Sequence, residues 1–113
     1  MRLVLTVWKN RISPVADSAR QILVVDAGNN MILDRRTESF ESESVFHRAK
    51  MIADLGAEIF ICGAISDFFS SLLEGNGIRL ISFICGEVEE VLCAYFGNSL
   101  HCPEFMMKGY FKP

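Results

Sequence analysis

Three short apolar segments set the main constraint on the fold of this chain. They cover residues 3–8, 58–63 and 78–83, and the last two are each followed by a segment with helical spacing of its apolar residues. Short runs of β-branched and apolar residues are typical of strands that are covered on both faces. Strands that alternate with helices pair in parallel through right-handed crossovers. The sequence therefore predicts an α/β fold with residues 3–8 as the middle strand.

Two further apolar segments, 21–26 and 31–36, are separated by the string AGNN. Gly and Asn tolerate the positive φ angles that tight hairpin turns require, so we expect these segments to form an antiparallel hairpin. The polar segment 9–20 contains Pro14 and is predicted to be a loop with room for one short helical turn.

Three amphipathic helices are predicted to cover both faces of the sheet. Their starts and ends are signalled by capping residues and glycines: Ser42 or Ser44 to Gly56, Ser66 to Gly75, and Gly86 to Gly97. The expected fold is thus a mixed five-stranded sheet with helices on both faces, and residues 99–113 form a tail or closing loop.

Composition limits the classes of protein to which the chain can belong. Half of its 113 residues are apolar, which is enough for one continuous core and predicts a single domain over residues 1–113. The net charge of −3 argues against nucleic acid or an anionic membrane as a default partner. The apolar start MRLVLTVW lacks the features of a signal peptide, and no apolar run reaches the roughly 20 residues of a membrane helix. We therefore expect a cytoplasmic protein.

The four cysteines, Cys62, Cys85, Cys93 and Cys102, are scattered along the chain without a C-x-x-C spacing. This pattern gives no support to a local zinc site. A free cysteine in a reducing compartment is commonly a small buried apolar residue, so packing in the core is the simplest interpretation of each.

The residues do not predict catalysis. The strand expected at 3–8 carries no carboxylate that could hold the two metal ions of a nuclease, and the chain has no phosphate-binding G-x-x-x-x-G-K-[ST] string. His47 and His101 are the only histidines, and His47 is expected on the solvent face of its helix. A nucleophile paired with a histidine base is therefore not apparent.

Several strings, taken in order, resemble a known family: VWKNRISPVADSARQILVVD, ICGAIS, GNGI, SFICGEVEEVLCAYFGN and PEFMMKG. The chain is similar over nearly its whole length to the nitrogenase accessory factors, also called NifX-like or dinitrogenase iron–molybdenum cofactor-binding proteins. The resemblance implies a ribonuclease-H-like fold. It also implies a non-catalytic protein that carries an iron–molybdenum cofactor or another molybdenum-containing metal–sulfur cluster, with cluster-assembly or acceptor proteins as partners. Family members often have Pro-Gly-Cys after the last motif, whereas Met107 here precedes Lys-Gly-Tyr.

Ligands of open α/β sheets bind outside the carboxyl ends of the parallel strands, which here lie after Trp8, Ile61 and Phe83. The candidate cofactor-binding residues near these ends are Lys9, Arg11, Ser13, Gly63, Ser66 and Gly86. The candidate metal ligands are Cys62, Cys85, His101 and Cys102. The helix N-termini after Ser66 and Gly86 would attract an anionic cluster.

A structural interpretation stands beside each of these assignments. Ser66 can simply cap its helix, the two cysteines near the strand ends can pack in the core, and Trp8 can be a core or rim aromatic residue. Three glutamates within 87–90 would repel an anion. His101 and Cys102 are adjacent and would point to opposite sides of an extended chain. A protein-interaction or regulatory module without a ligand remains the alternative function.

Overall fold

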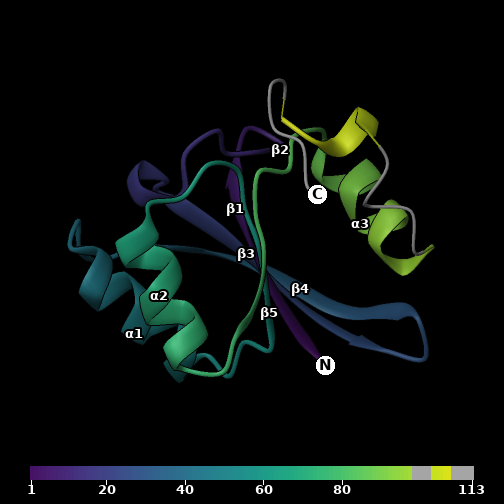
Figure 1. Ribbon diagram of the computed structural model, residues 1–113. Coiled ribbons are helices and arrows are strands. Elements are labelled where there is room, and N and C mark those ends of the chain that lie inside the picture. Colours follow the sequence, from purple (N-terminus) through teal and green to yellow (C-terminus); the bar gives the residue numbers. More distant parts are fainter. Residues whose placement is uncertain (98–102, 108–113) are drawn as a thin grey trace.

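Strand β1 (Arg2–Trp8) runs through the middle of a mixed six-stranded sheet in the computed structural model (Figure 1). The strand order is β4-β3-β1-β5-β6, and β2 pairs with β1 outside this path. β1 is antiparallel to β3 and parallel to β5, and β5 is parallel to β6. The structure describes residues 1–97 and 103–107. The predicted central position of residues 3–8 and the predicted hairpin on one side of them are confirmed.

The remaining elements follow the predicted order. The strands are β2 (Arg11–Ile12), β3 (Gln21–Gly28), β4 (Met31–Ser39), β5 (Ile59–Ile61) and β6 (Arg79–Ile81). The helices are α1 (Val45–Asp54), α2 (Asp67–Gly75) and α3 (Val88–Phe96), with short 3-10 turns η1 (Ala16–Ser18) and η2 (Pro103–Phe105). In the described part of the chain, no helix has the length and hydropathy to cross a bilayer.

The prediction of five strands is wrong because it missed β2. Lys9 and Asn10 both adopt positive φ angles, 49° and 63°, and form a two-residue turn that folds the chain back on β1. Val7 then pairs with Ile12, and Trp8 pairs with Arg11. A strand of two residues has no periodicity that a sequence pattern could show. The predicted helical turn in this segment is present as η1.

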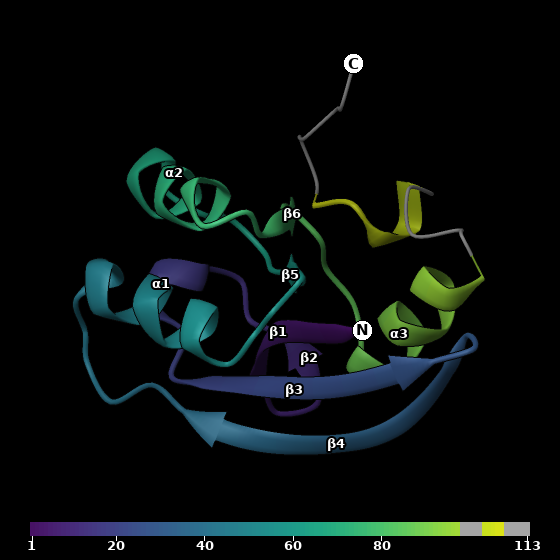
Figure 2. The same cartoon turned by 90° about the horizontal axis from the view of Figure 1, so that it is seen from below.

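Two apolar layers lie on opposite faces of the sheet, as Figure 2 shows with α1 and α2 on one side and α3 on the other. The side chain of Val4 enters the layer below α1 and α2, while Leu3 and Leu5 enter the layer below α3. Phe60 and Phe69 fix α2 to the sheet, with ring centroids 6.0 Å apart. Each fully buried side chain of this size contributes about 1.5–3 kcal/mol, so the two layers dominate the stability of the fold. The predicted covering of both faces is confirmed.

β5 and β6 are shorter than the predicted segments 58–63 and 78–83, yet the chain stays paired beyond their ends. The Cys62 amide donates to the Ile81 carbonyl, and the Ile84 amide donates to the Cys62 carbonyl, each at 3.0 Å. Phe83 adopts a positive φ of 61°, which is rare for a bulky residue and bends the chain at this point. The two segments therefore remain hydrogen-bonded up to the point where the loops at the carboxyl edge of the sheet begin.

Candidate functional site

The loops that follow β1, β5 and β6 meet at one edge of the sheet, as predicted for the carboxyl ends of parallel strands. The loop after β1 is hydrogen-bonded to the turn that leads into α3. The Ile12 amide donates to the Gly86 carbonyl at 3.0 Å, and the Val88 amide donates to the Asn10 carbonyl at 2.8 Å. The backbones of Arg11 and Glu87 form an antiparallel bridge between them. The structure thus brings Arg11 beside Gly86.

Gly63 lies against the backbone of the loop after β1. The Ala64 amide donates to the Pro14 carbonyl at 2.8 Å, and the Ala16 amide donates to the Ala64 carbonyl at 2.7 Å. A Cβ atom on Gly63 would lie 2.5 Å from the carbonyl oxygens of both Ser13 and Pro14. Gly63 is therefore required by a close backbone contact, which is a structural role in addition to its predicted place near a ligand.

Ser66 donates hydrogen bonds to Asp17, a residue to which the sequence pattern assigns no role at the site. Its amide donates to Asp17 Oδ1 at 2.8 Å and its hydroxyl donates to Asp17 Oδ2 at 2.5 Å. The Ser66 hydroxyl oxygen also accepts from the Phe69 amide at 3.2 Å, which is an N-cap bond. A carboxylate of the protein thus already occupies the N-terminus of α2, where we had expected a cluster anion.

Cys62 belongs to the core rather than to the surface of the site. Its side chain is fully buried in the layer below α1 and α2. Burial raises the pKa of the Cys62 thiol well above its usual range, and the negative charge of Asp17 adds to this effect. A metal needs the thiolate, so this position argues against Cys62 as a ligand in the observed conformation.

Cys85 is the partly exposed thiol of the site. It lies in the turn between β6 and α3, where its Sγ is 3.5 Å from the Met106 carbonyl oxygen and 4.0 Å from that of Glu104. Cys93 is exposed on α3. The predicted ligands His101 and Cys102 lie outside the described residues. Among the cysteines that the structure describes, Cys85 is therefore the one whose thiol lies at the junction of the loops.

The charge at the N-terminus of α3 is less negative than its three glutamates suggest. Arg35 of β4 forms an ion pair with Glu89, with Nη1 2.6 Å from Oε2. The hydrogen bond from Arg35 lowers the pKa of Glu89, so this carboxylate stays ionised but compensated. Arg11 is exposed and its backbone is paired with that of Glu87. Arg35 extends the site to a strand that the sequence had not connected with it.

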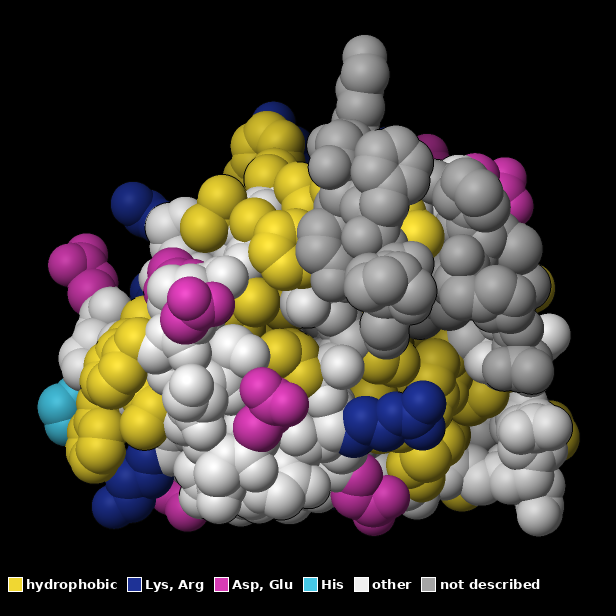
Figure 3. All heavy atoms as spheres, in the orientation of Figure 1, with side chains coloured by type: hydrophobic (Ala, Val, Ile, Leu, Met, Phe, Trp, Pro, Cys, Tyr) yellow, Lys and Arg dark blue, Asp and Glu magenta, His cyan; other side chains and the backbone are white. Residues whose placement is uncertain are grey.

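The side chain of Lys9 contacts the ring of Trp8. Its Nζ lies over the ring of Trp8, 4.8 Å from the centroid, and the Trp8 side chain is 58% exposed. Trp8 is thus a rim residue, one of its two predicted positions. Apolar side chains gather at the upper edge of the molecule and over its left side in Figure 3. An exposed tryptophan with a cation above it can stack on a ligand.

Trp8 and Lys9 line an open groove of about 1030 Å³. Arg48 of α1 forms part of its wall and is almost completely buried. Its guanidinium donates to the backbone carbonyls of Ser42, Asp17 and Ala19 at 2.7, 2.9 and 2.5 Å. The charged residues lining the groove are three cations and three anions: Lys9, Arg20, Arg48, Asp17, Glu41 and Glu43. The groove therefore has no excess charge that would select an anion.

The site consists mainly of backbone contacts between the loops, and the described residues around it include few candidate metal ligands. Of the predicted residues, the structure gathers Arg11, Ser13, Gly63, Cys85 and Gly86 around the three loops. The side chains of Lys9, Ser66 and Cys62 make other contacts: that of Lys9 with Trp8, that of Ser66 with Asp17, and that of Cys62 within the core layer below α1 and α2. Within residues 1–97 and 103–107, no group of three or more His, Cys, Asp or Glu residues could hold a metal ion.

Comparisons with known proteins agree with this architecture. The family model described as dinitrogenase iron-molybdenum cofactor matches residues 1–98. The crystal structure of PH0822 is similar with a TM-score of 0.84 and 17% sequence identity, over 96% of each chain. The apo form of the orange protein from Desulfovibrio gigas is similar with a TM-score of 0.73 and 15% identity, over 99% of this chain and 96% of that one. No curated protein matches the sequence significantly.

Proposed function

Because this chain belongs to the dinitrogenase iron–molybdenum cofactor family, we propose that it binds and carries a metal–sulfur cluster where its three strand-end loops meet. One observation carries the proposal. Cys85 is a partly exposed thiol in the turn next to Gly86, and Gly86 is hydrogen-bonded to the loop that contains Arg11. A thiolate is a soft ligand that suits iron, and a neighbouring arginine offsets the negative charge of a cluster.

The residues present suit a cargo that is held loosely. The described part of the chain offers no group of three metal ligands, so this part can form few bonds to the metal atoms. A cluster bound through one thiol, nearby cations and backbone N–H groups can be passed on to an acceptor protein. We propose that the cargo is an iron–molybdenum cofactor or a related molybdenum-containing cluster, and that the protein is a non-catalytic carrier.

Three finer assignments belong to the same proposal and rest on the sequence and its resemblance. They are the ribonuclease-H-like classification of the fold, a single domain over residues 1–113, and a cytoplasmic location. The likeness to solved structures at 15% and 17% identity supports the general α/β fold and goes no further.

The test is metal binding by protein prepared without oxygen. The full chain is purified anaerobically and incubated with ferrous iron, sulfide and molybdate, and then analysed for metal content and visible absorption. We expect bound metal and a charge-transfer band in the wild type, a strong loss in Cys85→Ala, and no loss in Cys93→Ala. A colourless wild type without bound metal would reject the carrier function. Equal binding by Cys85→Ala and the wild type would reject the assignment of the thiol.

The alternative is a protein-interaction or regulatory module on the same fold. The exposed side chains of Trp8, Phe46 and Phe68, which are 58%, 56% and 60% accessible, are apolar contacts that such a module could use. This function predicts a colourless protein that captures a defined partner in the absence of any metal. Loss of that capture in Trp8→Ala would favour it over the carrier.

A further inference from the structure

The described part of the C-terminal region, residues 103–107, lies along the Cys85 turn, and we call it the C-terminal strap. The Cys85 amide donates to the Phe105 carbonyl and the Met107 amide donates to the Phe83 carbonyl, each at 2.8 Å. Ile84 and Met106 form an antiparallel bridge between these two bonds. The strap therefore continues the sheet by a short antiparallel pairing just beyond the end of β6, which is an edge strand.

The strap also engages the thiol of Cys85. Sγ lies 3.5 Å from the Met106 carbonyl oxygen and 4.0 Å from the Glu104 carbonyl oxygen. A carbonyl only accepts hydrogen bonds, so this geometry suits a thiol that keeps its proton and donates it. A sulfur bound to a metal has lost that proton and would face two carbonyl oxygens without a donor between them. Metal binding and the observed position of the strap therefore compete for the same sulfur.

One aromatic side chain holds the strap over the neighbouring glycine. A Cβ atom on Gly86 would lie 3.6 Å from Phe105 Cδ1, so the Phe105 ring covers Gly86 directly. Phe105 is only partly buried at the margin of the layer below α3. The strap is thus attached by a half-buried ring and a few backbone bonds, and these contacts can break while the core layers stay intact.

We propose that the C-terminal strap is a gate that closes over the cluster site and must move aside before Cys85 can bind metal. In the closed position the Met106 carbonyl accepts a hydrogen bond from the Cys85 thiol, and the Phe105 ring covers Gly86. In the open position the Cys85 thiol and Gly86 are exposed to solvent. The inference rests on the proposed function for its purpose, but the exposure of the thiol can be measured without any metal.

The first experiment measures labelling of thiols in the full chain with an alkylating reagent and mass spectrometry. A background variant, Cys93→Ser with Cys102→Ser, leaves Cys85 and the buried Cys62, which reports on unfolding of the core. Met107→Pro removes the amide that donates to Phe83, whereas Met107→Ala keeps it and serves as the matched control. Phe105→Ala is an independent way to release the strap.

We expect Cys85 to react at least tenfold faster in Met107→Pro and in Phe105→Ala than in Met107→Ala, while Cys62 stays unlabelled in all of them. Equal rates for Cys85 in the three variants would overturn the gate. The same conclusion would follow if Cys62 labelling rose in step with that of Cys85 in both release variants, because the strap would then hold the core and not the thiol.

The second experiment distinguishes a failure of the gate proposal from a failure of the proposed cluster binding. The same three substitutions, now made in the chain that keeps all four cysteines, are incubated anaerobically with ferrous iron, sulfide and molybdate, and the rate of metal uptake is measured. A gate over a cluster site predicts uptake at least fivefold faster in the release variants than in Met107→Ala. Faster thiol labelling without metal uptake in any variant would reject the cargo and keep the gate. Equal uptake by all variants would reject the gate and keep the cargo.

Discussion

The carboxylate of Asp17 accepts two hydrogen bonds from Ser66, one from the amide at 2.8 Å and one from the hydroxyl at 2.5 Å. This contact joins the loop after β1 to the start of α2, across 49 residues of sequence. It places a negative charge at the positive end of the helix. The protein thus satisfies this helix end itself, so the cluster of the proposed function would have its positive partners near Arg11 and α3.

Removal of the Asp17 carboxylate should weaken the fold. We expect Asp17→Ala to lower the free energy of unfolding by about 1–2 kcal/mol, because the Ser66 amide and hydroxyl lose a charged acceptor. Asp67→Ala is the matched control, since Asp67 is an exposed acid in the first turn of the same helix. Urea titrations of both variants measure the difference. Equal effects of the two substitutions would show that the contact with Ser66 adds nothing to the general helix-dipole interaction.

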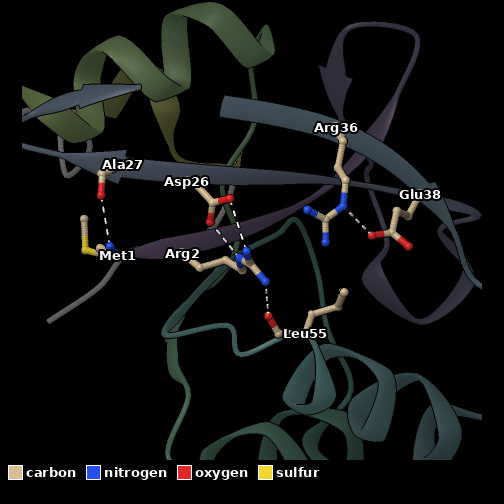
Figure 4. A network of polar contacts seen from close by, with 7 residues as sticks. All are labelled: Met1, Arg2, Asp26, Ala27, Arg36, Glu38 and Leu55. Carbon is tan, nitrogen blue, oxygen red and sulfur yellow. Dashed lines mark hydrogen bonds and ion pairs between the residues drawn. The ribbon is translucent and has the colours of Figure 1, made fainter. Parts of the chain in front are cut away.

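The opposite edge of the sheet is fixed by Arg2, which points to both Asp26 and the Leu55 carbonyl (Figure 4). Arg2 Nε lies 2.7 Å from Asp26 Oδ1, and Arg2 Nη1 donates to the Leu55 oxygen at 2.6 Å. The hydrogen bonds from Arg2 lower the pKa of Asp26. A carboxylate with a lowered pKa in the folded state stabilises the protein above its unfolded pKa of about 3.9, and this contribution is lost as the pH falls through the folded value.

The melting temperature of the wild type should therefore exceed that of Asp26→Asn near neutral pH. The difference should shrink as the pH falls below about 4, because the Asp26 carboxyl becomes protonated first in the unfolded chain and only at a lower pH in the folded protein. Thermal melts between neutral pH and strong acid measure this, with the exposed acid Asp54, changed to Asn, as the control. A difference that stays constant over the whole pH range would show that the ion pair does not carry the effect.

Cys62 should be chemically silent in the folded protein. Its side chain is fully buried, and burial raises the pKa of its thiol well above the usual range. Alkylation of the native wild type should therefore label Cys93 before Cys85 and leave Cys62 unlabelled, and denaturant should make Cys62 reactive. Peptide mass spectrometry after timed labelling gives the comparison. Rapid labelling of Cys62 under native conditions would contradict the position of this thiol in the core.

Arg48 should be one of the most sensitive charged residues for stability. Its guanidinium bonds to three backbone carbonyls and lies 4.5 Å from the centroid of the Phe40 ring, so it joins the connection before α1 to that before β3. We expect Arg48→Met to lower the free energy of unfolding by about 2–4 kcal/mol, because buried carbonyls lose their donors. Lys50→Ala on the exposed side of the same helix should change it by less than about 0.5 kcal/mol. Chemical denaturation distinguishes the two.

The elements with a clear local pattern over several residues could be predicted from the sequence. The apolar run at 3–8 predicted the central strand, and the string AGNN predicted the hairpin, because period and turn chemistry are local properties. β2 has only two residues, and its turn uses Lys9 and Asn10 in place of the usual glycine. Local propensity gives no reason to expect that pairing.

The sequence could predict where the candidate site lies in the fold better than it could predict which residues contact one another there. The rule for strand ends brought Arg11, Cys85 and Gly86 to one junction. The sequence could not show that Cys62 points into a core layer, because the two cysteines follow their strands in similar strings. The roles of Asp17 depend on contacts across many residues of sequence, which no local pattern encodes.

The junction itself can be tested at Gly63, where the backbones of two loops touch. A Cβ atom added there would lie 2.5 Å from the carbonyl oxygens of Ser13 and Pro14, and backbone atoms cannot move aside as flexible side chains can. We expect Gly63→Ala to lower the free energy of unfolding by about 2–4 kcal/mol. It should also weaken metal uptake, since the loop that carries Arg11 must shift.

Gly75→Ala is the matched control for this substitution. Gly75 ends α2 without a positive φ angle and with no atom within 4 Å of an added Cβ, so alanine should be neutral or stabilise the protein by about 0.5–1 kcal/mol. Urea titration gives the stabilities, and metal analysis after anaerobic reconstitution gives the uptake. If Gly63→Ala were as stable as Gly75→Ala and took up metal normally, the two loops could not be in the close contact that defines the site.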